Sequence, residues 1–181
     1  MAVTMMRTLV LVAGLALCAS QSDAQTKPES STQVERGRSL FEKSSKGLPC
    51  GTCHSLEGIG KAVAPDLRRL GAIATPRDLA RAIDMQRTVF VQEVQTSAGK
   101  TFPGLQKQIK GDTLYVWDLS VTPPLLRELK TADIVSMREN VKWGHPPASV
   151  DYTPQELADI IGFIKAAALG EHGEIVPADL K

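Results

Sequence analysis

Residues 50–54 read Cys50-Gly51-Thr52-Cys53-His54, and this stretch decides the fold and the chemistry that we expect of the chain. Two cysteines three positions apart, followed at once by a histidine, form the attachment pattern for c-type haem. In that pattern the two thiols add to the two vinyl groups of the porphyrin, and the histidine binds the iron as its proximal ligand. We therefore predict one covalently attached haem c, held by Cys50 and Cys53, with His54 as the proximal iron ligand.

A Cys-x-x-Cys pair also occurs in dithiol oxidoreductases and in zinc sites, so both remain alternatives. A thioredoxin-like pair opens a helix after a buried strand, whereas the residues before Cys50 are the polar run Ser44-Ser45-Lys46-Gly47-Leu48-Pro49. A zinc site needs two further ligands, which here would have to be the distant His145 and His172. Both alternatives therefore fit the sequence less well than haem attachment does.

The first 24 residues have the features of a secretory signal peptide. Arg7 precedes an apolar run at 9–17, and the small residues Ser22 and Ala24 stand before an expected cleavage site at Gln25. The run is shorter than the about 20 apolar residues that span a bilayer. We therefore predict that residues 1–24 are removed, that the protein is periplasmic or otherwise exported, and that the mature chain has no membrane span.

Removal of the signal peptide leaves Cys50 and Cys53 as the only cysteines, in a compartment that oxidises free thiols. Their alternatives there are a strained local disulfide or the haem. Lipidation at Cys18 remains another possible fate of the N-terminus, although Leu17 stands where a lipid-attachment site favours a small residue.

The mature chain reads as one domain, at 33–169, between a polar linker at 25–32 and a polar tail at 170–181 that contains His172. Its first helix is indicated by residues at helical spacing: Val34, Gly37, Leu40 and Phe41. We expect Gly37 to allow another helix to approach closely, because a glycine within a helix costs about 1 kcal/mol relative to alanine.

Two further helices are indicated by threonine-proline pairs. Thr75 and Pro76 provide an N-cap and a first helical residue for a short helix that ends near Asp84. The run Thr153-Pro154-Gln155-Glu156 is a capping box that starts the last helix. The expected buried stripe of that helix, and the glycine that closes it, are Leu157, Ile160, Ile161, Ile164 and Gly170.

Between these helices the periodicity changes to that of strands. The strand-like runs are 89–96, 101–109, 114–117 and 125–129, and turns separate them at 98–99, 110–112 and 121–124. We therefore predict a small antiparallel sheet of three or four strands, inserted at about 88–131 into a helical domain.

In this order, these features resemble the class I cytochrome c-type haem-binding domain with a β insert that is found in secreted bacterial proteins. The matching residues are Gly37–Phe41, Cys50–His54, Pro65–Leu67, the β insert, Ser136–Pro146 and Thr153–Ile164. The resemblance implies a mainly α, cytochrome c-like helical fold around one covalent haem, with the small sheet placed before the loop that carries the distal ligand. Pro65, which has a fixed φ and no amide donor, suits a rigid wall on the proximal side. We expect Pro65 and Leu67 to pack against the haem.

The sixth iron ligand is where this chain departs from that family. A Met-Pro pair shortly before the last helix supplies the distal methionine in the family, and His145-Pro146 stands at that position here. Imidazole is a good iron ligand at neutral pH. The resemblance therefore implies bis-histidine ligation by His54 and His145, with Met137 as an alternative distal ligand and an empty or otherwise filled site as another.

Two classes of function follow from the ligand set. A single haem with both axial positions filled leaves no place for a substrate, which favours an electron carrier, not an enzyme, that exchanges single electrons with redox partner proteins of unknown identity. The alternative is a haem enzyme, such as a peroxidase-like protein, or a gas or redox sensor with an open distal site. We find no acid-base pair or nucleophile constellation. The net charge of +1, without a basic run, gives no indication of nucleic acid binding.

Overall fold

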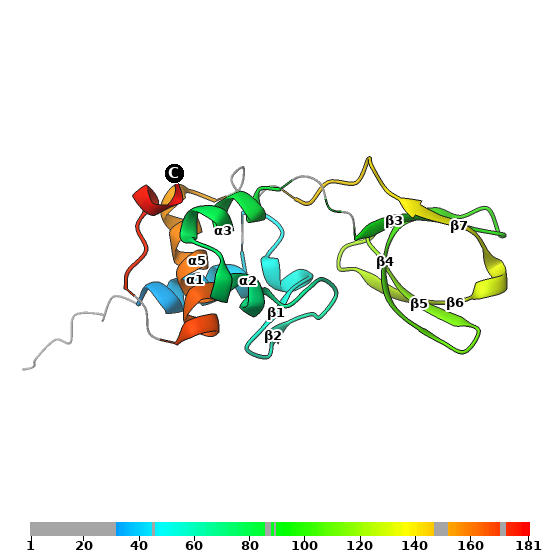
Figure 1. Cartoon of the computed structure of the whole chain (residues 1–181), viewed down its shortest axis with the longest axis horizontal. Coiled ribbons are helices and arrows are strands. Elements are labelled where there is room, and N and C mark those ends of the chain that lie inside the picture. The colour runs from blue at the N-terminus through cyan, green and yellow to red at the C-terminus, as the bar shows by residue number, and fades with distance from the viewer. Residues whose placement is uncertain (1–31, 45, 86–87, 89, 147–151, 171–172) are drawn as a thin grey trace, which may run out of the picture. The chain divides into compact units, whose positions relative to one another are not determined.

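The computed structural model describes residues 32–44, 46–85, 88, 90–146, 152–170 and 173–181. The predicted signal peptide, Cys18, most of the linker and His172 lie outside the described residues. The α-helices are α1 (Gln33–Glu42), α2 (Leu67–Ile73), α3 (Pro76–Ile83) and α5 (Pro154–Leu169) (Figure 1). The strands are β1 (Ser55–Leu56), β2 (Ile59–Gly60), β3 (Val91–Thr96), β4 (Thr101–Lys110), β5 (Thr113–Asp118), β6 (Leu125–Lys130) and β7 (Ile134–Glu139). Short 3-10 turns are η1 (Cys50–Thr52), η2 (Thr131–Asp133) and η3 (Pro177–Leu180).

Helix α5 is the element on which the other helices pack, since α1, α2 and α3 all contact it. Its start confirms the predicted capping box, because Thr153 accepts a hydrogen bond from the amide of Glu156 and the Glu156 carboxylate accepts one from the amide of Thr153. Gly170 closes it with a φ of 80°. The local signals at both ends of this helix were therefore sufficient to predict it.

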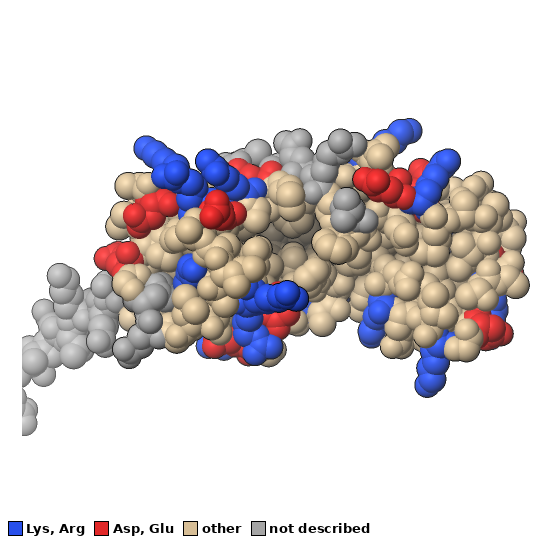
Figure 2. All heavy atoms as spheres, in the orientation of Figure 1, with Lys and Arg blue, Asp and Glu red and all other residues tan. Residues whose placement is uncertain are grey.

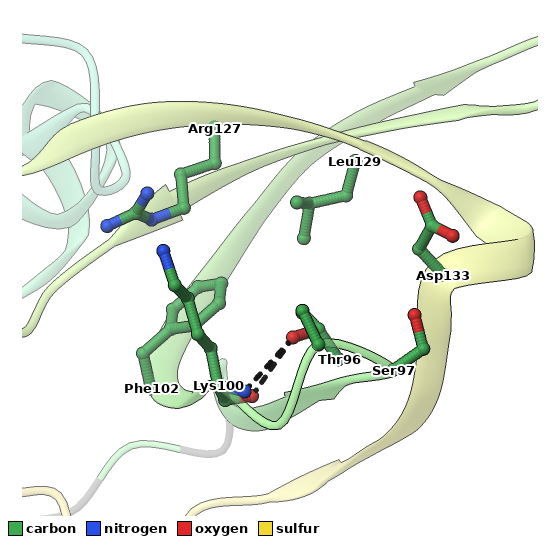
Figure 3. Close-up of a pocket in the computed structure, with 8 residues that line it drawn as sticks. Thr96, Ser97, Lys100, Phe102, Arg127, Leu129 and Asp133 are labelled. Atoms are coloured by element: carbon green, nitrogen blue, oxygen red, sulfur yellow. Dashed lines mark hydrogen bonds between the residues drawn. The ribbon is translucent and has the colours of Figure 1, made fainter.

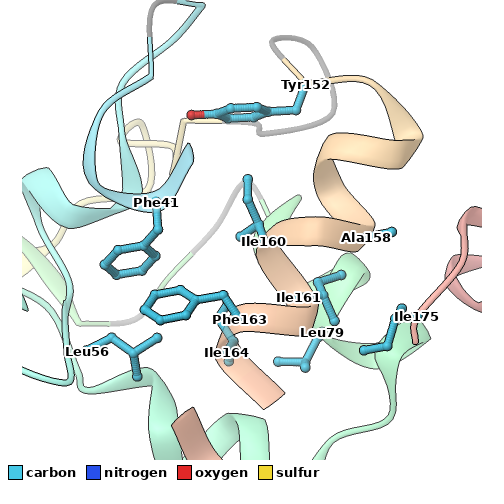
Figure 4. Close-up of a cluster of buried hydrophobic side chains, with 10 residues drawn as sticks. All are labelled: Phe41, Leu56, Leu79, Tyr152, Ala158, Ile160, Ile161, Phe163, Ile164 and Ile175. Atoms are coloured by element: carbon cyan, nitrogen blue, oxygen red, sulfur yellow. The ribbon is translucent and has the colours of Figure 1, made fainter. Parts of the chain in front are cut away.

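Half of the buried residues of the helical core come from α5. Figure 4 shows the buried set: Phe41, Leu56, Leu79, Tyr152, Ala158, Ile160, Ile161, Phe163, Ile164 and Ile175. The rings of Phe41 and Phe163 meet edge to face with their centroids 5.5 Å apart. Burying each large apolar side chain stabilises the fold by about 1.5–3 kcal/mol. Three of the four predicted stripe residues belong to this set, and the fourth, Leu157, is partly buried.

Helices α1 and α5 cross so closely that only glycine fits at position 37. A Cβ atom there would overlap the backbone carbonyl of Asp159 and press on Phe163, which confirms the predicted role of Gly37. Beside the crossing, Arg36 forms an ion pair of 2.9 Å with Asp159, whose side chain is 5% exposed. Burial would raise the pKa of Asp159, but hydrogen bonds from Arg36 and Gln155 outweigh it and keep the pKa below its usual range.

The helix at α3 confirms the prediction, with Thr75 as N-cap and Asp84 as C-cap. Helix α2 was not predicted, although Asp66 caps it by accepting a hydrogen bond from the amide of Arg68.

The C-terminal segment packs against the helices. Ile175 is buried, and its backbone exchanges two hydrogen bonds with the side chain of Gln33. The interpretation of 170–181 as a polar tail misses this packing.

Five antiparallel strands form one sheet in the order β6-β5-β4-β3-β7. Its buried cluster is Val94, Phe102, Leu114 and Val116. Gly104 lies beside this cluster, since a Cβ atom there would press on the side chains of Val94 and Val116. The cluster shares no residue with the helical core, so the sheet has an apolar centre of its own.

The prediction of a mainly α, class I cytochrome c-like helical fold with a small insertion is wrong. The sheet extends from Val91 to Glu139 instead of about 88–131, and a second sheet pairs β1 with β2. The strand of this sheet that was not predicted is β7, because the predicted insert ended at about 131 and the resemblance matched the residues after it to the stretch before the last helix. In the structure β7 pairs with β3, so the first and last strands of the sheet are neighbours.

The pairing of β3 with β7 returns the chain to the place where it entered the sheet. The amide of Asn140, directly after β7, donates to the carbonyl of Val91 at 3.0 Å. The chain can therefore form a large sheet and still continue from the place where it entered the sheet.

Charges of both signs are interspersed on the face drawn in Figure 2. Among the described residues, no helix is long and apolar enough to cross a membrane.

We expect Gly37→Ala to destabilise the fold by about 3 kcal/mol, because the added methyl group overlaps backbone, which cannot rotate away. Urea unfolding followed by circular dichroism measures this. Gly173→Ala is the matched control, since a Cβ there would meet no atom within 4 Å. Equal unfolding midpoints for the two variants would contradict the close crossing.

Candidate functional site

The cysteine-histidine motif forms a tight turn. The carbonyl of Cys50 accepts hydrogen bonds from the amides of Cys53 and His54, at 3.1 and 2.8 Å. The carbonyl of Cys53 in turn accepts from the amides of Val63 and Ala64, at 3.0 and 2.8 Å. Both thiols are free and partly buried. The turn is therefore held by backbone bonds alone, which leaves both sulfur atoms available for chemistry.

The short hairpin of β1 and β2 packs directly behind this turn. Gly60 has a φ of 79°, and a Cβ there would overlap the carbonyl of His54 and press on Gly51. The amide of Lys61 then donates to the carbonyl of Gly51 at 2.9 Å. These contacts fix the backbone of His54 from behind.

His54 is held in a form suited to metal binding. Its Nδ1 lies 2.8 Å from the carbonyl oxygen of Pro65, so the neutral ring carries its proton on Nδ1, donates it to that carbonyl and leaves Nε2 as the free lone pair. Burial lowers the pKa of His54, which outweighs the opposing effect of this bond. A neutral imidazole with one oriented lone pair is what a metal ligand requires.

The structure brings His145 next to His54. The two ring centroids are 6.2 Å apart, with an angle of 50° between the ring planes. Between the two residues lie 90 positions and the whole five-stranded sheet. The two histidines are therefore neighbours in the structure, and their ligation of a haem iron stays a prediction.

An asparagine positions the loop that carries His145. The side-chain oxygen of Asn140 accepts hydrogen bonds from the amides of Lys142 and Trp143, at 3.1 and 3.0 Å. The Trp143 ring then stands edge-on to His145 with centroids 6.5 Å apart. The Asn140 turn thus connects the end of β7 to the histidine, and the indole ring limits where the imidazole can lie.

His145 itself has an incomplete set of partners. Its Nδ1 is buried, and no hydrogen-bond partner for it exists among the described residues. Burial lowers the pKa of His145, although backbone groups of Pro146 and Ile83 and the charge of Asp84 act in the opposite direction. A buried ring nitrogen without a partner is unfavourable by about 1–3 kcal/mol. The ring is therefore neutral and suited to a group that the described residues do not supply.

The separation of the two imidazole rings can be compared with the one that two histidine ligands of a single metal ion would have. An imidazole nitrogen lies about 1.1 Å from its ring centre and binds a transition metal at about 2.0 Å, so two trans imidazoles place their centres about 6 Å apart. The observed 6.2 Å matches this separation. Since a porphyrin supplies four nitrogens of its own, two protein ligands are enough. The described part of the chain holds no group of three or more His, Cys, Asp or Glu placed to bind a bare metal ion.

The environment of the thiols does not match a dithiol oxidoreductase. Burial raises the pKa of Cys50 to about 11, and burial also raises the pKa of Cys53, against the smaller effect of Lys61. A catalytic dithiol has the opposite property, because its attacking sulfur is a thiolate near neutral pH. Both cysteines are unpaired, and buried thiols with raised pKa values do not have the activated sulfur that dithiol exchange requires.

The other predicted site residues are Pro65, Leu67 and Met137, and they lie in different parts of the structure. Pro65 acts through its carbonyl oxygen on His54, and Leu67 begins α2 and packs against the helical core. Met137 lies in β7 opposite Val94 and packs against the sheet cluster. This packing argues against Met137 as an iron ligand. Contact of Pro65 and Leu67 with haem stays a prediction.

Sequence reasoning missed Asn140, although a signal was present. Asparagine side chains commonly bond the backbone two residues further along, and Asn140 directly follows an alternating run.

A comparison of the chain with protein-family models finds no match, and a search of curated proteins finds no similar sequence. The resemblance to cytochrome-type domains therefore stays a prediction from the residues.

We expect alkylation of Cys50 in the haem-free, reduced protein to accelerate with pH up to about 11, because only the thiolate reacts and burial disfavours it. Cys53→Ser isolates this thiol, and iodoacetamide labelling read by mass spectrometry between pH 7 and 11 gives the profile. The same variant in urea is the control, with a midpoint near the ordinary value of about 8.5. A folded-state midpoint equal to the urea value would contradict the buried environment.

Proposed function

We propose that this chain is an exported c-type cytochrome with a single haem, which transfers single electrons between redox partner proteins. Cys50 and Cys53 hold the porphyrin, His54 is the proximal ligand and His145 is the distal ligand. The observation that carries this proposal is the 6.2 Å separation of the two imidazole rings, directly beside two free thiols. The haem, when bound, supplies an iron that changes its charge by one electron.

Different residues of the chain would attach the porphyrin and bind the iron. Thiol addition across a vinyl group consumes no oxidant, because the sulfur bonds to one carbon and the thiol hydrogen goes to the other. It does require both sulfurs as reduced thiols, which agrees with Cys50 and Cys53 being unpaired. The Pro65 carbonyl orients His54 through Nδ1, and a bond of this kind raises the basicity of a ligating imidazole.

Two imidazole ligands favour transfer of electrons over chemistry on a substrate. A second ligand on the iron leaves no position for oxygen, peroxide or a gas. Paired imidazoles also give a lower reduction potential than a histidine-methionine pair, since methionine raises the potential of cytochromes c. The carrier would therefore serve a more reducing couple than a methionine-ligated relative.

Electron paramagnetic resonance of the ferric protein, produced with a haem-attachment system, tests the proposal. We expect a low-spin bis-imidazole signal for the native chain and a high-spin or exchanged-ligand signal for His145→Ala. His172→Ala is the matched control, because it changes the one other histidine outside the motif. We expect its spectrum to equal that of the native chain.

The other outcomes distinguish the remaining classes. A high-spin signal in the native protein that His145→Ala leaves unchanged would mean an open distal site and a haem enzyme or sensor. Failure to attach haem at Cys50 and Cys53, shown by the absence of a covalent haem band on a denaturing gel, would refute the proposal as a whole.

We expect Asn140→Ala to loosen the distal ligand while leaving haem attached. It removes two hydrogen bonds of about 1 kcal/mol each from the turn before His145. Cyanide binding to the ferric iron, followed by absorbance, should become about tenfold faster as His145 dissociates more often. Asn140→Asp keeps the acceptor oxygen and should retain the native rate. Equal rates for the alanine and aspartate variants would show that this oxygen does not position His145.

A further inference from the structure

The sheet contains a cavity of about 320 Å³ on the face that carries its apolar cluster (Figure 3). Its walls come from the ends of β3, β4 and β6 and from the segments that connect them. The residues that matter for its chemistry are Thr96, Lys100, Phe102, Arg127, Leu129 and Asp133. None of them belongs to the candidate haem site, so the cavity calls for an explanation of its own.

Arg127 is fixed in place by contacts on two sides. Its Nε and Nη2 lie 2.7 and 2.6 Å from one carboxylate oxygen of Asp118. Its guanidinium also lies over the Phe102 ring, 5.5 Å from the centroid. The other carboxylate oxygen of Asp118 accepts from the amide and hydroxyl of Ser120, at 2.8 and 2.5 Å. Asp118 is 1% exposed, so it holds the arginine from behind and does not itself enter the cavity.

One edge of this guanidinium remains available. No partner for Nη1 of Arg127 exists among the described residues. An arginine that is oriented in advance loses little freedom when it binds an anion, which is why such side chains recognise carboxylates well.

Lys100 adds a second cation at the same end of the cavity. Figure 3 shows its ammonium directed toward the Arg127 guanidinium. Within the described part of the chain it forms no ion pair. Its backbone is fixed to Thr96, whose amide donates to the Lys100 carbonyl at 2.9 Å and whose hydroxyl accepts from the Lys100 amide at 3.2 Å. Asp118 balances Arg127, and Figure 3 shows the Asp133 carboxylate on the side of the cavity away from the two cations, so Lys100 gives the Arg127 end an additional positive charge.

The remainder of the wall is apolar beside these cations. Phe102 is 6% exposed and belongs to the sheet cluster, and Leu129 packs against that cluster. A ligand that satisfies both cations would thus place its body against an aromatic ring and an aliphatic side chain. The volume lies at the small end of the range for ligand sites, about 300–1,000 Å³.

We propose that this cavity binds a small organic monocarboxylate with an aromatic or branched apolar body. The carboxylate lies between Lys100 and Arg127, and the body packs on Phe102 and Leu129. An inorganic anion satisfies the charge but not the apolar wall, and a neutral aromatic satisfies the wall but not the charge. The site is independent of haem, and the proposal goes beyond electron transfer.

Phenylacetate is the probe that we would use first, by calorimetric titration of the full mature protein. We expect a Kd of about 1 mM, as is typical for a ligand of this size. Benzyl alcohol, an uncharged aromatic compound with the same benzyl group and no carboxylate, and inorganic phosphate should bind at least about tenfold more weakly, because each loses one of the two contacts. Backbone amide shifts in two-dimensional NMR should centre on Thr96, Lys100 and Phe102.

Lys100→Gln should weaken phenylacetate binding about fivefold, a loss moderated by the exposure of this side chain. Lys110→Gln is the matched control, since Lys110 is exposed at the far end of β4, the strand that begins directly after Lys100, and does not line the cavity. Equal weakening by both variants would indicate only a general charge effect and would overturn the site. Benzyl alcohol binding as tightly as phenylacetate, or no saturation by phenylacetate at 20-fold the expected Kd, would overturn it as well.

Discussion

The candidate site depends on the pairing of β3 with β7, which makes the first and last strands of the sheet neighbours. Closing a long flexible loop would oppose folding by an entropy that grows with the logarithm of its length. Here the loop is a folded sheet with its own apolar cluster, and the bond from Asn140 to Val91 closes it. His145 can therefore reach His54 although 90 residues separate them in sequence.

The two halves of the site are fixed by different means. His54 lies in a turn whose backbone bonds, with Gly60 packed against its carbonyl, leave little freedom. His145 lies in a loop held by the Asn140 side chain and bounded by the Trp143 ring. Burial keeps both imidazoles neutral by lowering the pKa of each ring. The backbone around His54 is rigid, whereas the position of His145 depends on a single turn. A substitution is therefore expected to displace His145 more easily than His54.

The sequence predicted those elements whose causes are local. The capping box at 153–156, the N-cap at Thr75, the cysteine-histidine motif and the period-two runs each act over a few residues, and Gly37 was conspicuous within a helical pattern. The fold class failed because strand β7 is defined by its partner β3, which lies about 40 residues earlier. Helix α2 and the packing of Ile175 depend likewise on contacts with distant segments. The approach of His145 to His54 was anticipated only through the resemblance to a family. The number of residues between two positions in the sequence does not give their distance in space.

Two buried carboxylate-arginine pairs show how a structural ion pair differs from a binding site. Asp159 is surrounded by groups of the helices that it joins, namely Arg36 on α1 and Gln155 on its own helix, together with Gln33. Its contacts are explained by the crossing of α1 and α5. Asp118 also anchors an arginine, but Arg127 extends past it over an aromatic ring toward a cavity and a second cation. The contacts with Asp118 and Phe102 account for the position of Arg127, but the Lys100 ammonium has no ion-pair partner among the described residues and like charges directed at the same space repel each other. An anion between them removes that repulsion, which is why this pair, and not the one at Asp159, indicates a ligand.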